Sequence, residues 1–301
     1  MSAADAKPKL PVLVFTDLDG TLLDHGDYSY SAAEPALARL RKLQIPIIPN
    51  TSKTLAELAQ LEVLHRAMDP CPCIVENGSA LCIPRGYFQP REDMVLLYGY
   101  EIVRLAPDYA SLLDVLHRLR REAGYRFRGF HDMSVQEVAA DTGLSVADAA
   151  RARQRLCSEP LVWEGSMEAF RKFEAALAEV GFSLTRGGRY WHVMAGQGKD
   201  QAMLQLQSLH EEASGIPYIT IALGDSPNDQ AMLCAADIAV VVRRPDGTHL
   251  DSRKAKRVLY THGTGPAGWN ESMQELIDEL GATGNSSLNR ITAEADSTGM
   301  T

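Results

Sequence analysis

The chain has 301 residues, of which 45% are hydrophobic and 23% charged, as in globular proteins of one large or two moderate domains. The formal net charge of −9 argues against a general nucleic-acid binder, because affinity for a phosphate backbone comes from clustered lysines and arginines. No apolar run approaches the roughly 18 residues of a membrane span and the N-terminus lacks a secretory leader, so we expect a cytoplasmic protein without a membrane partner. Five cysteines, an odd number, do not suggest a disulfide framework, and we expect buried thiols or loop residues. The sequence indicates no oligomeric state.

Short apolar segments in the first part of the chain predict strands that alternate with helices. Residues 10–15 (LPVLVF) predict a strand buried on both faces of a sheet, and the polar sequence TDLDGT follows them. A helix at 31–43, a strand at 45–49, a helix at 54–65 and a strand at 73–75 continue the pattern. This alternation predicts an α/β fold with a doubly wound parallel sheet, in which the carboxyl ends of the strands share one crevice.

The same alternation returns near the end of the chain. Residues 199–213 predict a helix, 218–223 (YITIAL) a buried strand, 228–235 a short helix and 237–242 another strand. The predicted strand at 218–223 leads into Gly224-Asp225, so another carboxylate follows directly after a buried strand.

The middle of the chain has a different pattern. Its predicted elements are helices at 108–123 and 166–180 and strands at 161–164, 182–186 and 190–194. Such a mixture indicates an inserted α+β module. We therefore predict a discontinuous Rossmann-like core at 8–83 and 197–280, an α+β cap at 84–196 and a disordered tail at 281–301.

Four aspartates follow predicted strands and are candidates for catalysis. Asp17 and Asp19 are two residues apart, so the side-chain period of a strand can direct both into one crevice. One carboxylate can then act as a nucleophile while the other moves protons to and from the leaving oxygen. Paired aspartates in a turn are also common as solvated or capping groups, so this pair alone leaves both interpretations open.

A second acidic cluster, Asp225 and Asp229 in GDSPND, strengthens the catalytic interpretation. At about 4 Å and an effective dielectric near 20, each pair of like charges costs on the order of 4 kcal/mol, so four converging carboxylates call for a cation. Oxygen ligands without cysteine or histidine favour Mg²⁺. The alternative is that Asp225 and Asn228 merely cap a helix.

Phosphoryl transfer also needs donors for the oxygens that carry charge in the transition state. Thr51 follows the second predicted strand and can offer its hydroxyl and its backbone N–H, and Lys199 begins a helix and can offer a fixed positive charge. Each would ordinarily be a cap or a solvated side chain. Their positions at the crevice favour the binding of phosphate.

DLDGT, Thr51, Lys199 and GDSPND, in that order and with a large insert, resemble the four motifs of the haloacid dehalogenase superfamily, in the subgroup with an α/β cap of type IIB. The resemblance implies that Asp17 is the nucleophile and Asp19 the general acid/base. It implies phosphate-binding roles for Thr51 and Lys199, and a metal site formed by Asp17, Asp225, Asp229 and the backbone carbonyl of Asp19.

Further motifs are similar to the mannosyl-3-phosphoglycerate phosphatase family and its glucosyl-acting relatives: TDLDGTLLDH, NTSKT, VENGSA, TRGGRYWH, GDSPND and GPAGWNE. The resemblance implies a small phosphorylated sugar-glycerate substrate. The candidate substrate-binding residues are Lys53, Arg186, Gly187, Gly188, Arg189 and His192, of which the arginines offer two guanidiniums to an anion.

Three alternatives stay open. The stretch of glycines and arginines can be a surface turn with solvated side chains. The enzyme can be a sugar phosphomutase with the same architecture. The chain can also be a protein that binds a sugar phosphate without catalysis.

Overall fold

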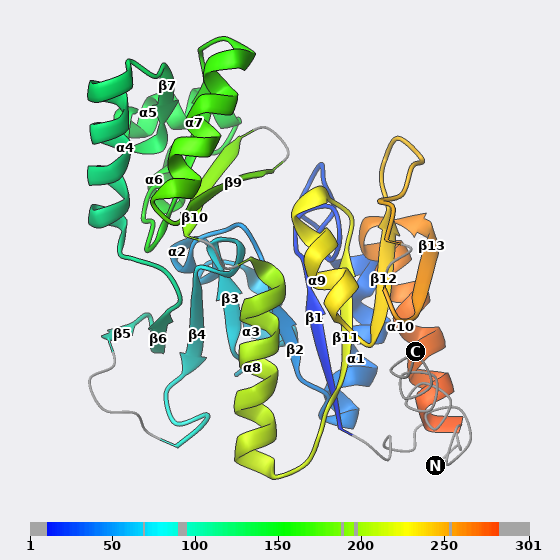
Figure 1. Cartoon of the computed structure of the whole chain (residues 1–301). Helices are drawn as coiled ribbons and strands as arrows, with labels where there is room; N and C mark the ends of the chain where they lie inside the picture. Colours follow the sequence, from blue (N-terminus) through cyan, green and yellow to red (C-terminus); the bar gives the residue numbers. More distant parts are fainter. Residues whose placement is uncertain are drawn as a thin grey trace, which may run out of the picture. The chain divides into compact units, whose positions relative to one another are not determined.

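The computed structural model describes residues 11–68, 70–89, 95–187, 190–195, 198–252 and 255–282 (Figure 1). By its internal contacts the chain divides into two units. The first unit contains Met1–Ile48, Gln207–Asp225 and Leu233–Thr301, and the second contains Pro49–Leu206 and Ser226–Met232. The predicted bounds of core and cap, 8–83 with 197–280 and 84–196, stay a prediction.

The first unit is built on a five-stranded sheet with the order β13-β12-β11-β1-β2. Its strands are β1 (Val12–Thr16), β2 (Ile47–Pro49), β11 (Ile219–Gly224), β12 (Ile238–Arg243) and β13 (Val258–Thr264). The pairs β1/β11, β11/β12 and β12/β13 are parallel. Every residue of β1 and β11 is buried, which explains their continuous apolar sequences.

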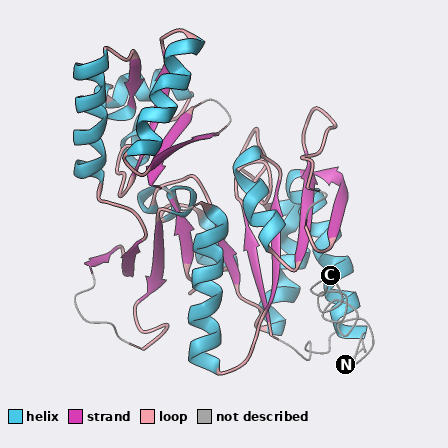
Figure 2. Cartoon of the chain, viewed as in Figure 1, coloured by secondary structure: helices cyan, strands magenta, loops and turns pink. Residues whose placement is uncertain are grey.

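Helices cover this sheet. The short η2 (Ser31–Ala33) leads into α1 (Glu34–Leu43), and α10 (Gly265–Ala282) packs against α1, β12 and β13. Helices α8 (Lys199–Ser214) and α9 (Gln230–Ala235) each have residues in both units. The predicted α/β fold with a parallel central sheet is confirmed (Figure 2).

The second unit contains an antiparallel sheet with the order β7-β8-β10-β9. Its strands are β7 (Phe127–Gly129), β8 (Ser158–Trp163), β9 (Phe182–Arg186) and β10 (Trp191–Ala195). Two amphipathic helices, α4 (Tyr109–Ala123) and α7 (Met167–Glu179), pack on this sheet. Their shared core consists of Leu112, Leu116, Phe127, Leu161, Phe173, Leu177, Phe182 and Val193.

A second antiparallel sheet in this unit has the order β3-β4-β6-β5, with β3 (Cys73–Val75), β4 (Ala80–Pro84), β5 (Val95–Leu97) and β6 (Tyr100–Arg104). The sequence pattern predicted β3 as a third strand of the parallel sheet. Its regular partner is instead the antiparallel β4, and one parallel bridge joins Ile74 to Asn50. The difference arises because the chain reverses in the tight turn η3 (Glu76–Gly78) directly after β3.

The helix predicted at 54–65 is two helices, α2 (Leu55–Leu58) and α3 (Glu62–Ala67). A capping box begins α2, in which Thr54 accepts from the Glu57 N–H and Glu57 accepts from the Thr54 N–H. The extended backbone of Leu61, with ψ 119°, separates the two helices.

The other helices of the second unit are short. They are α5 (Val135–Thr142), α6 (Val146–Ala152), η4 (Phe130–Asp132) and η5 (Pro227–Asp229), and the sequence pattern had not predicted α5 or α6. Ser134 and Ser145 cap α5 and α6 with their side chains.

The ends of the chain and the cysteines complete the comparison with the sequence. Of the predicted tail, Gly281 and Ala282 belong to α10, and 283–301 lie outside the described residues. Four cysteines are buried, as predicted, and Cys234 is partly buried. None of the helices in the described ranges is both long and apolar enough to cross a bilayer.

Candidate functional site

Asp17 and Asp19 lie directly after β1, in a turn that the backbone closes tightly. The Asp17 N–H donates to the Leu223 carbonyl at 2.9 Å and so extends the pairing of β1 with β11 by one residue. Asp17 is buried and Asp19 half-buried. Gly20 has φ 82°, a conformation that glycine adopts without steric cost, and its N–H donates to the Leu23 carbonyl at 2.9 Å.

A hydrogen-bonded chain from the C-terminal helix supports the end of β1. The indole Nε1 of Trp269 in α10 donates to the Thr16 hydroxyl at 3.0 Å, and this hydroxyl donates to the Asp17 carbonyl at 2.7 Å. Trp269 is completely buried. Since a buried indole N–H needs an acceptor, this contact fixes the helix and the strand end together.

Asp225 lies at the end of β11 in the same unit. Its Oδ1 accepts from the Thr21 hydroxyl at 3.0 Å, and its carbonyl accepts from Arg244 Nε at 2.7 Å. One carboxylate oxygen of Asp17 and one of Asp225 lie within 4.8 Å of each other. The structure therefore brings together these two aspartates, which are 208 positions apart in the sequence.

Two buried carboxylates at this distance repel each other by about 3–4 kcal/mol at an effective dielectric near 20. A divalent cation between them removes this cost. Their oxygen donors fit Mg²⁺, which proteins bind through one or two carboxylates together with water and substrate phosphates.

Asp229 and Lys199 form an ion pair inside the second unit. Lys199 Nζ donates to Asp229 Oδ1 at 2.6 Å, and both side chains are completely buried. The Ser226 N–H donates to Asp229 Oδ2 at 3.0 Å. Asn50 Nδ2 donates to the Lys199 carbonyl at 2.9 Å, so the residue before Thr51 contacts the first turn of α8.

Thr51 follows β2 and is fully buried. Its N–H donates to the Ile74 carbonyl at 3.0 Å, and its hydroxyl oxygen accepts from the Lys53 N–H at 3.2 Å. The side chain of Lys53 is half-buried two residues further on. These contacts fix the loop from which both residues extend.

The predicted substrate-binding residues in the hairpin of β9 and β10 differ in their surroundings. His192 in β10 is buried, and its burial together with the positive charges of Arg155 and Lys199 lowers its pKa to about 3. Its Nδ1 has no hydrogen-bond partner among the described residues. His192 is therefore neutral at physiological pH, with a ring nitrogen able to accept or donate a hydrogen bond.

Arg186 ends β9 and is exposed, with its guanidinium 5.4 Å from the centre of the Trp191 ring. Gly187 is close to His192, because a Cβ at this glycine would lie 2.9 Å from the histidine Nε2. Gly188 and Arg189 lie outside the described residues.

The sequence pattern assigned no catalytic or binding role to several residues that support these groups: Glu76, Asn77, Arg155, Asn228, Arg244 and Trp269. Four of them lie in the quoted segments VENGSA, GDSPND and GPAGWNE, so the signal was present without an assigned contact. Nothing in the local sequence distinguished Arg155 or Arg244 from a solvated arginine.

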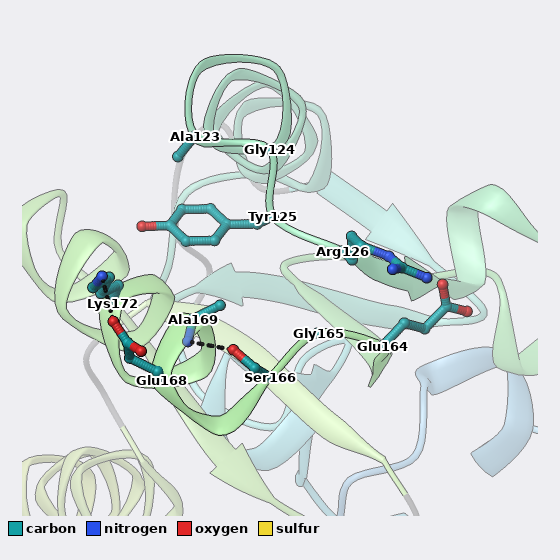
Figure 3. Close-up of a pocket in the computed structure, with 10 residues that line it drawn as sticks. All are labelled: Ala123, Gly124, Tyr125, Arg126, Glu164, Gly165, Ser166, Glu168, Ala169 and Lys172. Atoms are coloured by element: carbon teal, nitrogen blue, oxygen red, sulfur yellow. Dashed lines mark hydrogen bonds and ion pairs between the residues drawn. The ribbon is translucent and has the colours of Figure 1, made fainter.

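A pocket of about 510 Å³ lies at one end of the first antiparallel sheet of the second unit, and Figure 3 shows its lining. Tyr125, Arg126 and Glu164 line it, together with the first turns of α7, where Lys172 pairs with Glu168 at 2.8 Å. None of the predicted site residues lines this pocket. We therefore do not assign the candidate site to it.

No family model matches the chain. The chain is 38% identical over 270 residues to a protein of Methanococcoides burtonii named glucosyl-3-phosphoglycerate/mannosyl-3-phosphoglycerate phosphatase, and the match covers 88% of this chain and 97% of the relative.

Solved structures share the fold. One is a phosphatase of the haloalkanoate (HAD) enzyme superfamily from Bacteroides thetaiotaomicron, with a TM-score of 0.59 and 19% identity. The superposition covers 91% of this chain and 96% of that phosphatase. A sugar phosphatase of HAD subclass IIB also has a TM-score of 0.59, with 16% identity. This superposition covers 89% of this chain and 99% of the sugar phosphatase.

Proposed function

Because the chain belongs to the haloacid dehalogenase superfamily of phosphatases, we propose that it hydrolyses glucosyl-3-phosphoglycerate or mannosyl-3-phosphoglycerate to the glycosylglycerate and phosphate, with Mg²⁺ as cofactor. The choice of substrate rests on the relative that is 38% identical over 97% of its own length. The choice of chemistry rests on one observation, the buried pair of Asp17 and Asp225 at the ends of adjacent strands.

In the proposed first step, a carboxylate oxygen of Asp17 attacks phosphorus and the bond from phosphorus to the glycerate oxygen breaks. Asp19 gives its proton to the departing oxygen, so the glycosylglycerate leaves as an alcohol and Asp17 carries the phosphoryl group. In the second step, Asp19 takes a proton from water, whose oxygen attacks phosphorus and releases Asp17. The two steps return both aspartates to their starting states.

Asp17, Asp225, Asp229 and the Asp19 carbonyl are the proposed ligands of Mg²⁺, which would neutralise charge on the phosphoryl oxygens. Thr51 and Lys199 are the proposed phosphate-binding residues. The buried Lys199 supports this role, because its ammonium is held at one place by Asp229 and does not have to be ordered on binding.

The proposed substrate-binding residues Lys53, Arg186, Gly187, Gly188, Arg189 and His192 would hold the glycerate carboxylate and the sugar hydroxyls. Guanidiniums suit the carboxylate. The neutral His192 suits a hydroxyl, because its Nδ1, which has no partner among the residues that the structure describes, can accept a hydrogen bond from it.

The test is phosphate release from glucosyl-3-phosphoglycerate, mannosyl-3-phosphoglycerate and a panel of other sugar phosphates. We expect activity that a chelator abolishes and Mg²⁺ restores. Asp17→Asn should remove this activity, whereas the exposed Asp278→Asn in α10 should retain it. If Asp17→Asn were as active as the wild type, Asp17 would not be the nucleophile. Equally poor rates on every substrate would exclude the proposed specificity for glycosyl-phosphoglycerates. Isomerised product without free phosphate would indicate a phosphomutase.

A further inference from the structure

The turn after β3 has an unusual backbone. Glu76, Asn77 and Gly78 follow one another with φ of 53°, 58° and 98°, and all three residues are buried. Asparagine and glycine tolerate this left-handed region, whereas glutamate does so at a cost. Such a conformation persists only where the surroundings fix it, and it is common at functional sites.

Asn77 connects two loops of the second unit. Its N–H donates to the Thr51 carbonyl at 2.8 Å, and its Oδ1 accepts from Asn228 Nδ2 at 2.9 Å. The side chain is 1% exposed, and its Nδ2 has no hydrogen-bond partner in the described part of the chain. The left-handed conformation is what lets one residue direct its N–H and its side chain to different loops.

Gly78 brings the same turn to a third segment. A Cβ at this position would lie 2.4 Å from the Gly198 carbonyl oxygen and 3.0 Å from the Lys199 nitrogen. The backbone of the turn and the backbone that begins α8 are therefore in direct contact, and only glycine permits this approach.

The contact with Asn228 continues to the buried ion pair. The Ser226 hydroxyl donates to Asn228 Oδ1 at 2.5 Å, and the Ser226 N–H donates to Asp229 Oδ2 at 3.0 Å. Asp229 in turn accepts from Lys199 at 2.6 Å. Loss of the Asn77 side chain therefore removes a restraint two hydrogen bonds away from Asp229.

We propose that Asn77 is a positioning residue of the phosphatase reaction, which holds the loops of Thr51 and Asp229 in register beside the start of α8. This inference rests on the phosphate- and metal-binding roles proposed above for Thr51, Lys199 and Asp229. Asn77 acts on the reaction through these residues and does not itself exchange protons.

The test replaces Asn77 by glycine, which keeps the backbone N–H, tolerates the left-handed conformation and removes the side chain with its carboxamide. Gln44→Gly is the matched control, because Gln44 has φ 58° and ψ 37°, against 58° and 33° for Asn77, and is exposed at the end of α1. We expect kcat of Asn77→Gly to fall about tenfold or more, as misplaced catalytic groups produce. Binding of inorganic phosphate, measured by calorimetry on the folded protein, should weaken, and Gln44→Gly should change neither quantity.

Asn228→Ala and the double variant show whether the hydrogen bond between the two asparagines carries the effect. If it does, the double variant loses no more activity than the more impaired single variant. Values of kcat and phosphate affinity for Asn77→Gly within twofold of the wild type would overturn the proposal, as would losses that multiply in the double variant. Should the wild type release no phosphate from any ester, the proposed function fails, while the comparison of phosphate binding still tests the role of Asn77.

Discussion

Glu76 offers a direct test of how the second unit is held together. Its buried carboxylate accepts four hydrogen bonds, from the N–H groups of Leu156 at 2.6 Å, Cys157 at 3.0 Å and Ser158 at 2.9 Å and from the Ser158 hydroxyl at 2.8 Å. Arg155 Nε lies 3.6 Å from the same carboxylate, and the exposed fractions of the two side chains are 3% and 0%. Glu76→Gln keeps the shape of the side chain and changes one oxygen to an amide nitrogen.

The magnitude follows from these contacts. Glutamine keeps its single oxygen at the Oε2 position, where three donors meet, so its NH₂ group faces the N–H of Leu156. A hydrogen bond to a charged group contributes about 1.5–3 kcal/mol. In the variant, the hydrogen bond from the Leu156 N–H is lost, because this donor then faces the NH₂ group, which is also a donor. Arg155 also loses its buried countercharge, and breaking such a pair costs about 3–5 kcal/mol. The two effects overlap, so we expect a loss of about 3–5 kcal/mol.

The assay is urea-induced unfolding followed by circular dichroism, with the free energy of unfolding taken from the midpoint and slope. The matched control is Glu168→Gln, which removes an exposed ion pair with Lys172 in the same unit. We expect no measurable change in the control, because solvent screens exposed pairs. A Glu76→Gln variant as stable as Glu168→Gln would refute the conclusion that this carboxylate holds the 155–158 segment to the turn after β3.

Three further variants test other parts of the structure. Gly78 has φ 98°, and a Cβ there would lie 2.4 Å from a backbone oxygen, so Gly78→Ala should yield little folded protein by size-exclusion chromatography. Gly124 has φ 68° and open space around it, so the control Gly124→Ala should lower the free energy of unfolding in urea by only about 1 kcal/mol. Burial raises the pKa of Glu159 to about 7 from an ordinary value of 4.5, so its contribution to stability is present below pH 4.5 and is lost as the pH rises through 7. The wild type should therefore lose about 3 kcal/mol over this window relative to Glu159→Gln, and parallel pH profiles of the two proteins would contradict this. Trp269→Phe leaves the Thr16 hydroxyl without its buried donor and should lower the free energy of unfolding by about 1–3 kcal/mol. An unchanged midpoint of urea unfolding would show that this hydrogen bond does not contribute to stability.

The elements of the parallel sheet were predictable because their signals are local. The strands at β1 and β11 are buried on both faces and therefore consist of uninterrupted apolar residues. Asp17 and Asp225 follow these strands directly, and adjacent parallel strands end at the same edge, so their approach to within 4.8 Å follows from the pattern. The break in the helix predicted at 54–65 was harder to predict from the sequence, since it depends on the backbone conformation of Leu61.

Contacts between distant segments could not be predicted in this way. Glu76 binds residues 80 to 82 positions further on, Lys199 pairs with Asp229 30 positions away, and Trp269 donates to Thr16 across 253 positions. A sequence pattern shows that such side chains are polar or aromatic, but it does not indicate which of them are buried together.

The sequence by itself determined the order of strands and helices and the aspartates that follow the strands, because hydrophobic periodicity and chain direction act over neighbouring residues. The tertiary structure alone decided that β3 pairs with β4 and that the Asn77 turn joins the loops of Thr51 and Asn228. It also decided that His192 is buried and neutral. These features depend on which distant groups exclude water from one another, and that is fixed only when the chain has folded.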